Sequence, residues 1–124
     1  MSDRPSHNGL SKEDLLQVVL ESAIDFAIFT VDSNGLVTGW NIGVARVFGY
    51  SEQEIIGSSG DKIFTPEDRD ARVPEIERRQ ALSEGRAADE RWHQRKDGSR
   101  FWASGLLMPC LGSSNGFVKI ARSD

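Results

Sequence analysis

Residues 88–110 read ADERWHQRKDGSRFWASGLLMPC, and this stretch decides the fold. Asp97-Gly98 lies between two runs with the composition of strands, and Asp-Gly in that setting is the strongest short-range signal for a hairpin with a type I′ turn. The two runs also carry two of the three tryptophans, Trp92 and Trp102. We therefore expect a long hairpin whose faces form the main working surface of the domain.

Further strands lie on both sides of this hairpin. Residues 26–32 (FAIFTVD) and 36–40 (LVTGW) are rich in aromatic and β-branched residues and are separated by Ser33-Asn34-Gly35, so they predict a first hairpin. Residues 117–122 (FVKIAR) predict a fifth strand. Strands on either side of a helical block predict an α+β domain with an antiparallel sheet.

The helical block occupies residues 41–84. Asn41, Ser51 and Thr65 are residue types that begin helices, and they predict short helical pieces after each. A longer, mostly charged helix is expected from Pro74 to Glu84 on the surface of the sheet. Its predicted apolar contacts are Val73, Ile76 and Leu82.

The N-terminal part is expected to differ from the rest. Residues 1–9 are polar and contain proline and glycine, so we expect a disordered lead-in, with a compact domain over residues 25–124. Residues 10–24 predict an amphipathic helix that begins with a capping box at Ser11. Its apolar stripe either covers the domain's own surface or forms a dimer contact, and it comprises Leu15, Leu16, Val19, Leu20, Ala23 and Ile24.

Composition excludes several classes of function. At 124 residues the chain supports one domain, and its net charge of −4 provides no basic face for nucleic acid. No run approaches the ~18–20 apolar residues of a membrane span, so we expect no direct membrane contact. A single cysteine, Cys110, excludes an internal disulfide and fits a reducing cytoplasm. His7, His93 and Cys110 are scattered, so we expect neither a metal site nor an enzyme.

Four pieces of the chain, in order, resemble a PAS domain with its C-terminal PAC motif. They are FTVDSNGLVTGWNIGVARVFGYSEQEIIG (29–57), IFTPEDR (63–69), RKDGSRFWASG (95–105) and GFVKIAR (116–122), and the resemblance covers residues 23–124. It implies a five-stranded antiparallel sheet in the order 2-1-5-4-3, with short helices over one face, a ligand cleft between them and an N-terminal cap helix.

The resemblance also implies a role. ERWHQRKDGSRFWASG (90–105) is most similar to sensor modules of bacterial histidine kinases of the HWE type, or of chemotaxis methylesterase–methyltransferase fusions. We therefore expect a cytoplasmic sensor or relay module of a two-component system. It would form a homodimer and act on a downstream kinase or other effector domain of the same polypeptide. The alternative is a ligand-free structural dimerisation and spacer module in the same kind of protein.

Family cofactors are tested residue by residue. Gly60 stands where the light-oxygen-voltage flavin modules carry the adduct-forming cysteine, and Asp61 replaces a phosphate-binding arginine, which excludes a flavin photoadduct. The helix at residues 74–84 has no histidine for haem. Cys110 lies beyond the position used by the coumaroyl thioester of the yellow photoreceptors. The expected ligand is therefore a small metabolite, or none.

Alternation along residues 101–108 assigns side chains to two faces. By resemblance to flavin-binding relatives, the face with Phe101 and Ala103 lines the cleft, and His93 occupies a position where those relatives use an amide. Gly105 leaves room above the sheet, although a strand glycine can also mean close backbone packing. The predicted ligand-binding residues are His93, Ala103, Gly105, Leu107, Phe117, Lys119, Asn41, Phe48 and Ile63.

Three of these residues have alternative interpretations. An inward Lys119 beside His93 would suit a carboxylate-bearing metabolite, because a buried ammonium needs a partner. Alternatively, Lys119 reaches the rim and His93 is a half-buried residue with its own partners. Asn41 is also well placed as a helix N-cap.

The opposite face of the sheet is apolar, and such a face does not stay bare in a stable monomer. We expect it to be the dimer or partner face, together with the N-terminal helix. The predicted partner residues are Leu15, Leu16, Val19, Ala23, Trp102, Leu106, Met108, Val118 and Ile120.

Overall fold

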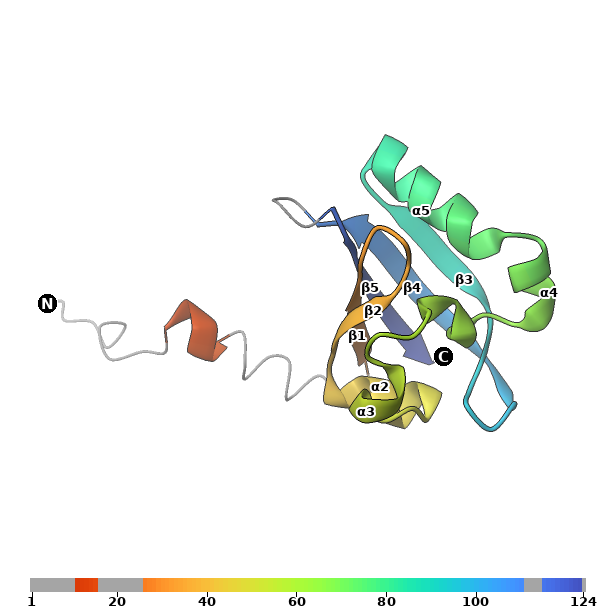
Figure 1. The fold of residues 1–124 in the computed structure, drawn as a ribbon, viewed down its shortest axis with the longest axis horizontal. Helices are drawn as coiled ribbons and strands as arrows, with labels where there is room; N and C mark the ends of the chain where they lie inside the picture. The colour runs from red at the N-terminus through yellow and green to blue at the C-terminus, as the bar shows by residue number, and fades with distance from the viewer. Residues whose placement is uncertain (1–10, 16–25, 111–114, 124) are drawn as a thin grey trace, which may run out of the picture.

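The computed structural model describes residues 11–15, 26–110 and 115–123. Five strands form one antiparallel sheet in the order β2-β1-β5-β4-β3 (Figure 1). The strands are β1 (Phe26–Val31), β2 (Val37–Trp40), β3 (Ala87–Gln94), β4 (Arg100–Pro109) and β5 (Phe117–Ser123). The first and last strands pair at the middle of the sheet. The α+β class and the predicted strand order are both confirmed.

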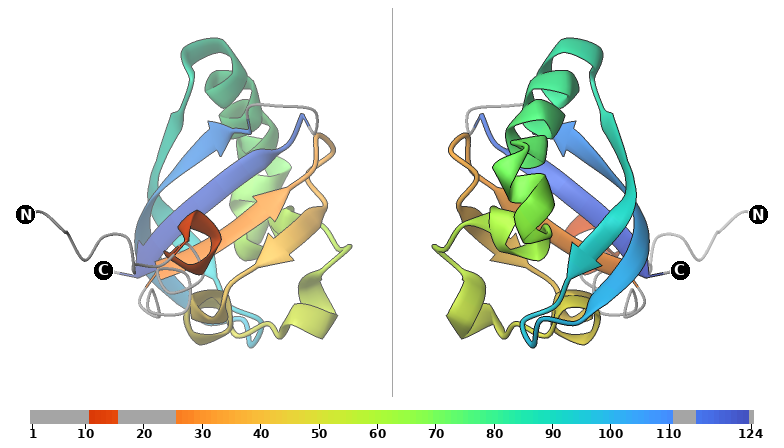
Figure 2. Two further views of the ribbon diagram at one scale, coloured as in Figure 1. Left: turned by 90° about the vertical axis from the view of Figure 1, so that its left-hand side faces the viewer. Right: turned by 90° about the vertical axis from the view of Figure 1, so that its right-hand side faces the viewer.

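Apart from a helical turn at residues 12–15, the described helices lie between β2 and β3 in the chain. They are α2 (Ile42–Phe48), α3 (Glu52–Ile55), the 3₁₀ helix η2 (Gly60–Ile63), α4 (Pro66–Asp70) and α5 (Val73–Glu84). Ser51 starts α3 with a full capping box, and Thr65 caps α4 with Pro66 in its first turn. The long helix α5 crosses one face of the sheet, and the opposite face is free of α2–α5 (Figure 2). None of the described helices is long and apolar enough to cross a membrane.

Only the first turn of the predicted N-terminal helix is described. Residues 12–15 are helical, and Ser11 Oγ accepts a hydrogen bond of 3.0 Å from the Asp14 N–H, as a capping box requires. Leu15 is exposed. Leu16, Val19, Ala23 and the predicted lead-in at residues 1–9 lie outside the described residues.

The β3–β4 hairpin is confirmed, but its predicted type I′ turn is wrong. A type I′ turn requires a positive φ at both central residues. Gly98 has a φ of 89°, but Asp97 does not have a positive φ. The loop is longer than the two residues of a type I′ hairpin. Its closing hydrogen bond runs from the Arg95 N–H to the Ser99 carbonyl at 2.8 Å. Lys96 N–H also donates to the Phe48 carbonyl, and this bond to α2 favours the longer loop.

The core lies between the sheet and the helices. It is built from aromatic and aliphatic side chains of both layers, including Phe29, Phe48, Ile55, Ile63, Phe101 and Phe117. The expected apolar contacts of α5 were partly wrong, because Ile76 and Leu82 point to solvent. The buried side of α5 is Pro74, Glu77 and Ala81 instead. A carboxylate is tolerated there because a cation on the sheet faces it.

Candidate functional site

A cluster of charged side chains lies inside the core between α5 and the sheet. Glu77 of α5, Asp89 and His93 of β3, and Lys119 of β5 are each at most 3% exposed. Lys119 Nζ donates a hydrogen bond of 2.8 Å to Glu77 Oε1 and a second one to Asp89 Oδ2. The ammonium group therefore has two carboxylate partners from the chain itself.

His93 and Arg91 complete the cluster. The two ring nitrogens of His93 lie 2.9 Å from the Ile63 carbonyl oxygen and 2.8 Å from Asp89 Oδ2. Arg91 Nε donates to Asp89 Oδ1 at 2.6 Å. Arg91 Nε also lies 3.3 Å from Glu77 Oε2, an ion pair without hydrogen-bond geometry. The cluster thus connects α5, β3, β5 and the end of η2.

The two carboxyl groups respond to burial in opposite ways. Burial raises the pKa of Glu77, and the charge of Lys119 only partly offsets this. Burial would also raise the pKa of Asp89, but the hydrogen bond from His93 and the charge of Lys119 hold it well below its usual range. Asp89 is therefore the carboxyl group of the cluster that stays ionised, and Glu77 is the one that protonates more readily.

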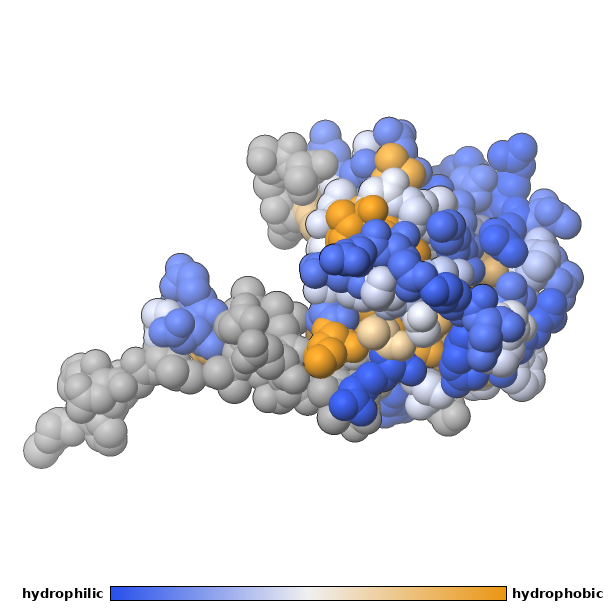
Figure 3. Space-filling view, turned by 60° about the horizontal axis from the view of Figure 1, so that its bottom comes forward, coloured by the Kyte–Doolittle hydropathy of each residue, from blue (hydrophilic) through white to orange (hydrophobic). Residues whose placement is uncertain are grey.

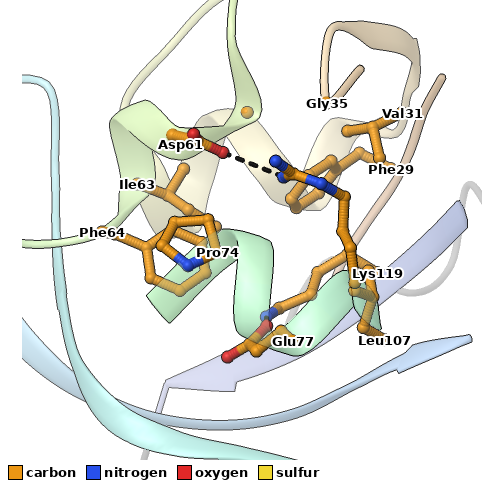
Figure 4. A pocket seen from close by; sticks show the side chains of 12 residues that line it. Phe29, Val31, Gly35, Asp61, Ile63, Phe64, Pro74, Glu77, Leu107 and Lys119 are labelled. Atoms are coloured by element: carbon orange, nitrogen blue, oxygen red, sulfur yellow. Dashed lines mark hydrogen bonds and ion pairs between the residues drawn. The ribbon is translucent and has the colours of Figure 1, made fainter. Parts of the chain in front are cut away.

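A small cavity lies beside this cluster. Its volume is about 30 Å³, which is enough for one or two water molecules. Glu77 and Lys119 border it on one side, and Asp61, in an ion pair of 3.2 Å with Arg78, borders it on another (Figure 4). Because the Phe29, Ile63, Phe64 and Leu107 side chains close the rest, the cleft is filled largely by the chain's own side chains.

These residues do not fit a flavin adduct. Gly60 lies at the cavity, and a Cβ atom at this position would be 3.1 Å from Val31 Cγ1 and 3.3 Å from the Gly35 carbonyl oxygen. A cysteine at residue 60 would therefore need its neighbours to move. Among the described residues no group of three or more His, Cys, Asp and Glu side chains is placed to hold a metal ion.

The structure brings part of the predicted ligand set together. Ile63, Leu107 and Lys119 line the cavity. Four more residues of this set are buried in the core around it, namely Phe48, His93, Ala103 and Phe117. Their ligand-binding role remains a prediction.

Gly105 and Asn41 do not line this cavity, and each has a structural role instead. A Cβ atom at Gly105 would lie 2.3 Å from the Ile120 carbonyl oxygen, so this glycine permits close approach of β4 and β5. Asn41 occupies the N-cap position of α2 without a side-chain bond to that helix. Its amide joins β1, with Oδ1 accepting from the Ile28 N–H at 2.8 Å and Nδ2 donating to the Phe26 carbonyl at 3.2 Å. The N-cap bond expected of Asn41 is thus replaced by bonds to β1.

Lys119 points inward, so the alternative in which it reaches the rim is wrong. His93 is fully buried rather than half-buried. Sequence reasoning missed Glu77, which is bonded to Lys119, and Asp89, which is bonded to both Lys119 and His93. Alternation along β3 places Asp89 on the same face as His93 and would have found it. Glu77 is three residues after Pro74 and four before Ala81, a helical spacing hidden by the surrounding charged residues.

The outer face of the sheet carries the predicted partner residues. Trp102 is 40% exposed and Trp92, directly opposite on β3, is 53% exposed. The two indole rings meet edge to face, with centroids 5.5 Å apart. Leu106, Met108, Val118 and Ile120 on this face are partly exposed. On the side of the molecule that Figure 3 shows, apolar areas are divided by hydrophilic ones.

The fold and sequence match known proteins. Residues 25–122 match the family described as PAS domain. "Two-component system protein A" of Emericella nidulans is 40% identical over 108 residues, which is 86% of this chain. The match spans only 16% of the length of that relative.

Solved structures agree with this match. The PAS domain of a protein from Colwellia psychrerythraea superposes with a TM-score of 0.77 and 25% identity, covering 90% of this chain and 98% of that one. A domain of a sensory box sensor histidine kinase/response regulator from Geobacter sulfurreducens gives a TM-score of 0.78 at 17% identity, covering 90% and 94%.

Proposed function

Since the chain belongs to the PAS domain family, we propose that it is a sensor or relay module of a two-component signal-transduction protein. The relative from Emericella nidulans supports the two-component context, and the domain from Geobacter sulfurreducens belongs to a sensor histidine kinase. The output is therefore proposed to be a histidine kinase in the same polypeptide. The resemblance of residues 90–105 favours the HWE type. Because one relative is fungal, the proposal is not restricted to bacteria.

The domain itself is proposed to have no catalytic role. It acts through contacts, in the cytoplasm, and its single cysteine Cys110 has no disulfide partner within the chain. Input changes the packing of the sheet, and the sheet passes that change to the attached effector domain. The effector's own activity and substrates belong to the longer protein.

The exposed apolar face of the sheet is the observation that carries the proposal. Trp92, Trp102 and Phe26 are each at least 39% exposed, on a face that α2–α5 do not cover. Large exposed aromatic side chains on one face mark a surface for association. We propose that a second copy of the chain covers it, with the N-terminal stripe as part of the same contact.

A mass measurement tests the association. The 124-residue chain and a chain that starts at Ser22 are compared by light scattering over a range of concentrations. A dimer for the longer chain and a monomer for the shorter one support the proposal. Equal monomeric masses for both chains would overturn it.

The alternative is a ligand-free spacer module, and the small cavity favours it. A space of about 30 Å³ is far below what most metabolites need. Native mass spectrometry of protein purified from its own host, with a thermal-shift screen of small carboxylates, separates the two functions. A retained small molecule supports ligand sensing, whereas an empty domain with no shift supports the spacer or a relay that senses only partner contact.

A further inference from the structure

Both ring nitrogens of His93 face hydrogen-bond acceptors. Nδ1 lies 2.9 Å from the carbonyl oxygen of Ile63, and Nε2 lies 2.8 Å from Oδ2 of Asp89. A backbone carbonyl oxygen offers only lone pairs, so Nδ1 must carry a proton to bond it. The state of Nε2 then depends on whether Asp89 has a proton to donate.

Asp89 is surrounded by donors and is ionised. Its Oδ1 accepts from Arg91 Nε at 2.6 Å, and its Oδ2 accepts from Lys119 Nζ as well as facing His93. Burial raises the pKa of the Asp89 carboxyl, but the hydrogen bond to His93 and the charge of Lys119 hold it well below its usual range. An ionised carboxylate only accepts, so Nε2 of His93 must carry a proton too.

We infer that His93 is a buried imidazolium cation and that its second proton latches the η2 segment onto the sheet. Ile63 is the last residue of η2, and the next residue, Phe64, pairs with His93 through an isolated β-bridge. The imidazole is thus the side chain that joins η2 to β3 while also holding Asp89.

Aromatic rings and charged side chains surround His93 in the core. The rings of Phe48, Phe64 and Phe101 lie 5.9, 4.9 and 6.4 Å from the imidazole centroid, so three sides are apolar. The charged groups of the described residues that face this cluster are Asp89 and Arg91 of β3, Lys119 of β5, Glu77 of α5 and, through Arg91, Asp68 of α4. Bulk solvent does not reach His93 and Asp89, which are at most 1% exposed, so a bond lost in this place is costly.

A neutral imidazole cannot make both bonds. If Nδ1 keeps the proton, the lone pair of Nε2 faces the Asp89 carboxylate. If Nε2 keeps it, the lone pair of Nδ1 faces the Ile63 carbonyl. Either arrangement presses two acceptors together inside the core. Raising the pH until His93 loses one proton should therefore separate η2 from β3 and open this end of the cleft.

This latch goes beyond the proposed signalling role, and it depends on the protonation of the His93 imidazole. The test uses the 124-residue protein labelled with ¹⁵N, with His7→Gln so that His93 is the only imidazole. Long-range ¹H–¹⁵N spectra report the protonation of each ring nitrogen from about pH 6 to about pH 9. Amide hydrogen exchange, corrected for the intrinsic rate at each pH, is measured on the same samples.

The expected result has two parts. At the lower pH both ring nitrogens of His93 are protonated. As one proton leaves, protection of the Gly60 and Phe64 amides, which bond Gly35 and Asp61 around η2, falls by about tenfold or more while protection across the β1–β5 pair stays constant. In His93→Gln, protection around η2 is low and independent of pH.

Three results would overturn the latch. They are a singly protonated ring at the lower pH, protection of η2 that is constant while one proton leaves, and loss of protection throughout the sheet at the same pH. If the ring is still doubly protonated at the upper pH, the titration is extended until one proton leaves. If His93→Gln does not fold, the wild-type titration alone decides between these outcomes.

Discussion

Lys119 Nζ on β5 lies 2.8 Å from Glu77 Oε1 on α5, and this ion pair joins the long helix to the middle of the sheet inside the core. Both side chains are nearly fully buried. An internal carboxylate thus occupies the position that one of the two interpretations of Lys119 gave to a ligand carboxylate. The pair makes the helix and the sheet respond together to any change in the charge of the cluster.

Replacing Lys119 should be costly. In Lys119→Met, the Glu77 and Asp89 carboxylates lose their shared cation within the core, and removing one partner of a buried pair costs about 3–5 kcal/mol. Urea unfolding measures the loss. Lys96→Met is the matched control, because Lys96 pairs with Glu54 at the surface, where water replaces the contact, and should change stability little. Similar stabilities of the two variants would contradict the buried-pair account.

The raised pKa of Glu77 gives stability a defined pH dependence. A carboxyl group whose pKa is higher in the folded state stabilises the fold fully below its unfolded pKa, and this contribution is lost as the pH rises through the folded pKa. Glu77→Gln lacks this term, so its stability relative to wild type should increase as the pH is raised from about 4 to about 7. Thermal unfolding at several pH values measures the difference. A constant difference, or one that decreases over this interval, contradicts the assignment.

Asp89 should behave in the opposite direction. The pKa of this carboxyl is lower in the folded state, so its stabilising contribution is present above its unfolded pKa and disappears as the pH falls through the folded pKa. Asp89→Asn should therefore be strongly destabilised near neutral pH and approach wild type as the pH falls below about 4. Denaturant titrations of wild type and Asp89→Asn, near neutral pH and below about pH 4, measure the difference in stability. The same loss of stability at both pH values would show that the cost of the substitution is steric.

Gly105 in β4 was expected either to leave room for a ligand or to permit close packing of the backbone, and a substitution by alanine distinguishes the two. A Cβ atom there would lie 2.3 Å from the Ile120 carbonyl oxygen, so Gly105→Ala should force β4 and β5 apart and cost about 1–3 kcal/mol. If the glycine instead left room for a ligand, alanine would be accepted with no loss. Thermal unfolding of the variant, with no ligand added, decides between the two.

The fold was largely predictable from the sequence because local signals agree with the tertiary structure. The hairpin, the helix starts at Ser51 and Thr65, and the alternation along β4 each depend on residues close in the chain. The turn type was not predictable, because the β3–β4 loop is also tied to α2 through the bond from Lys96 to Phe48. Contacts of that kind join residues far apart in sequence.

The charged cluster shows the same limit. Lys119 was recognised as a residue that needs a partner if buried, but its partners come from α5 and β3, 42 and 30 residues earlier. Glu77 appears in sequence as one charge among many on a surface helix. Only the packing of α5 on the sheet selects it from its neighbours Glu75 and Arg78.

The central claim is that the outer face of the sheet is a contact surface between copies of the chain, and Trp102 tests it most directly. Sedimentation equilibrium of wild type, Trp102→Ala and Ile76→Ala compares this face with an exposed apolar residue on α5. We predict that wild type and Ile76→Ala form dimers with the same dissociation constant. Trp102→Ala should raise that constant by about tenfold or more, equivalent to about 1.4 kcal/mol. An unchanged constant for Trp102→Ala, or a wild-type chain that stays monomeric at every concentration, would contradict the account.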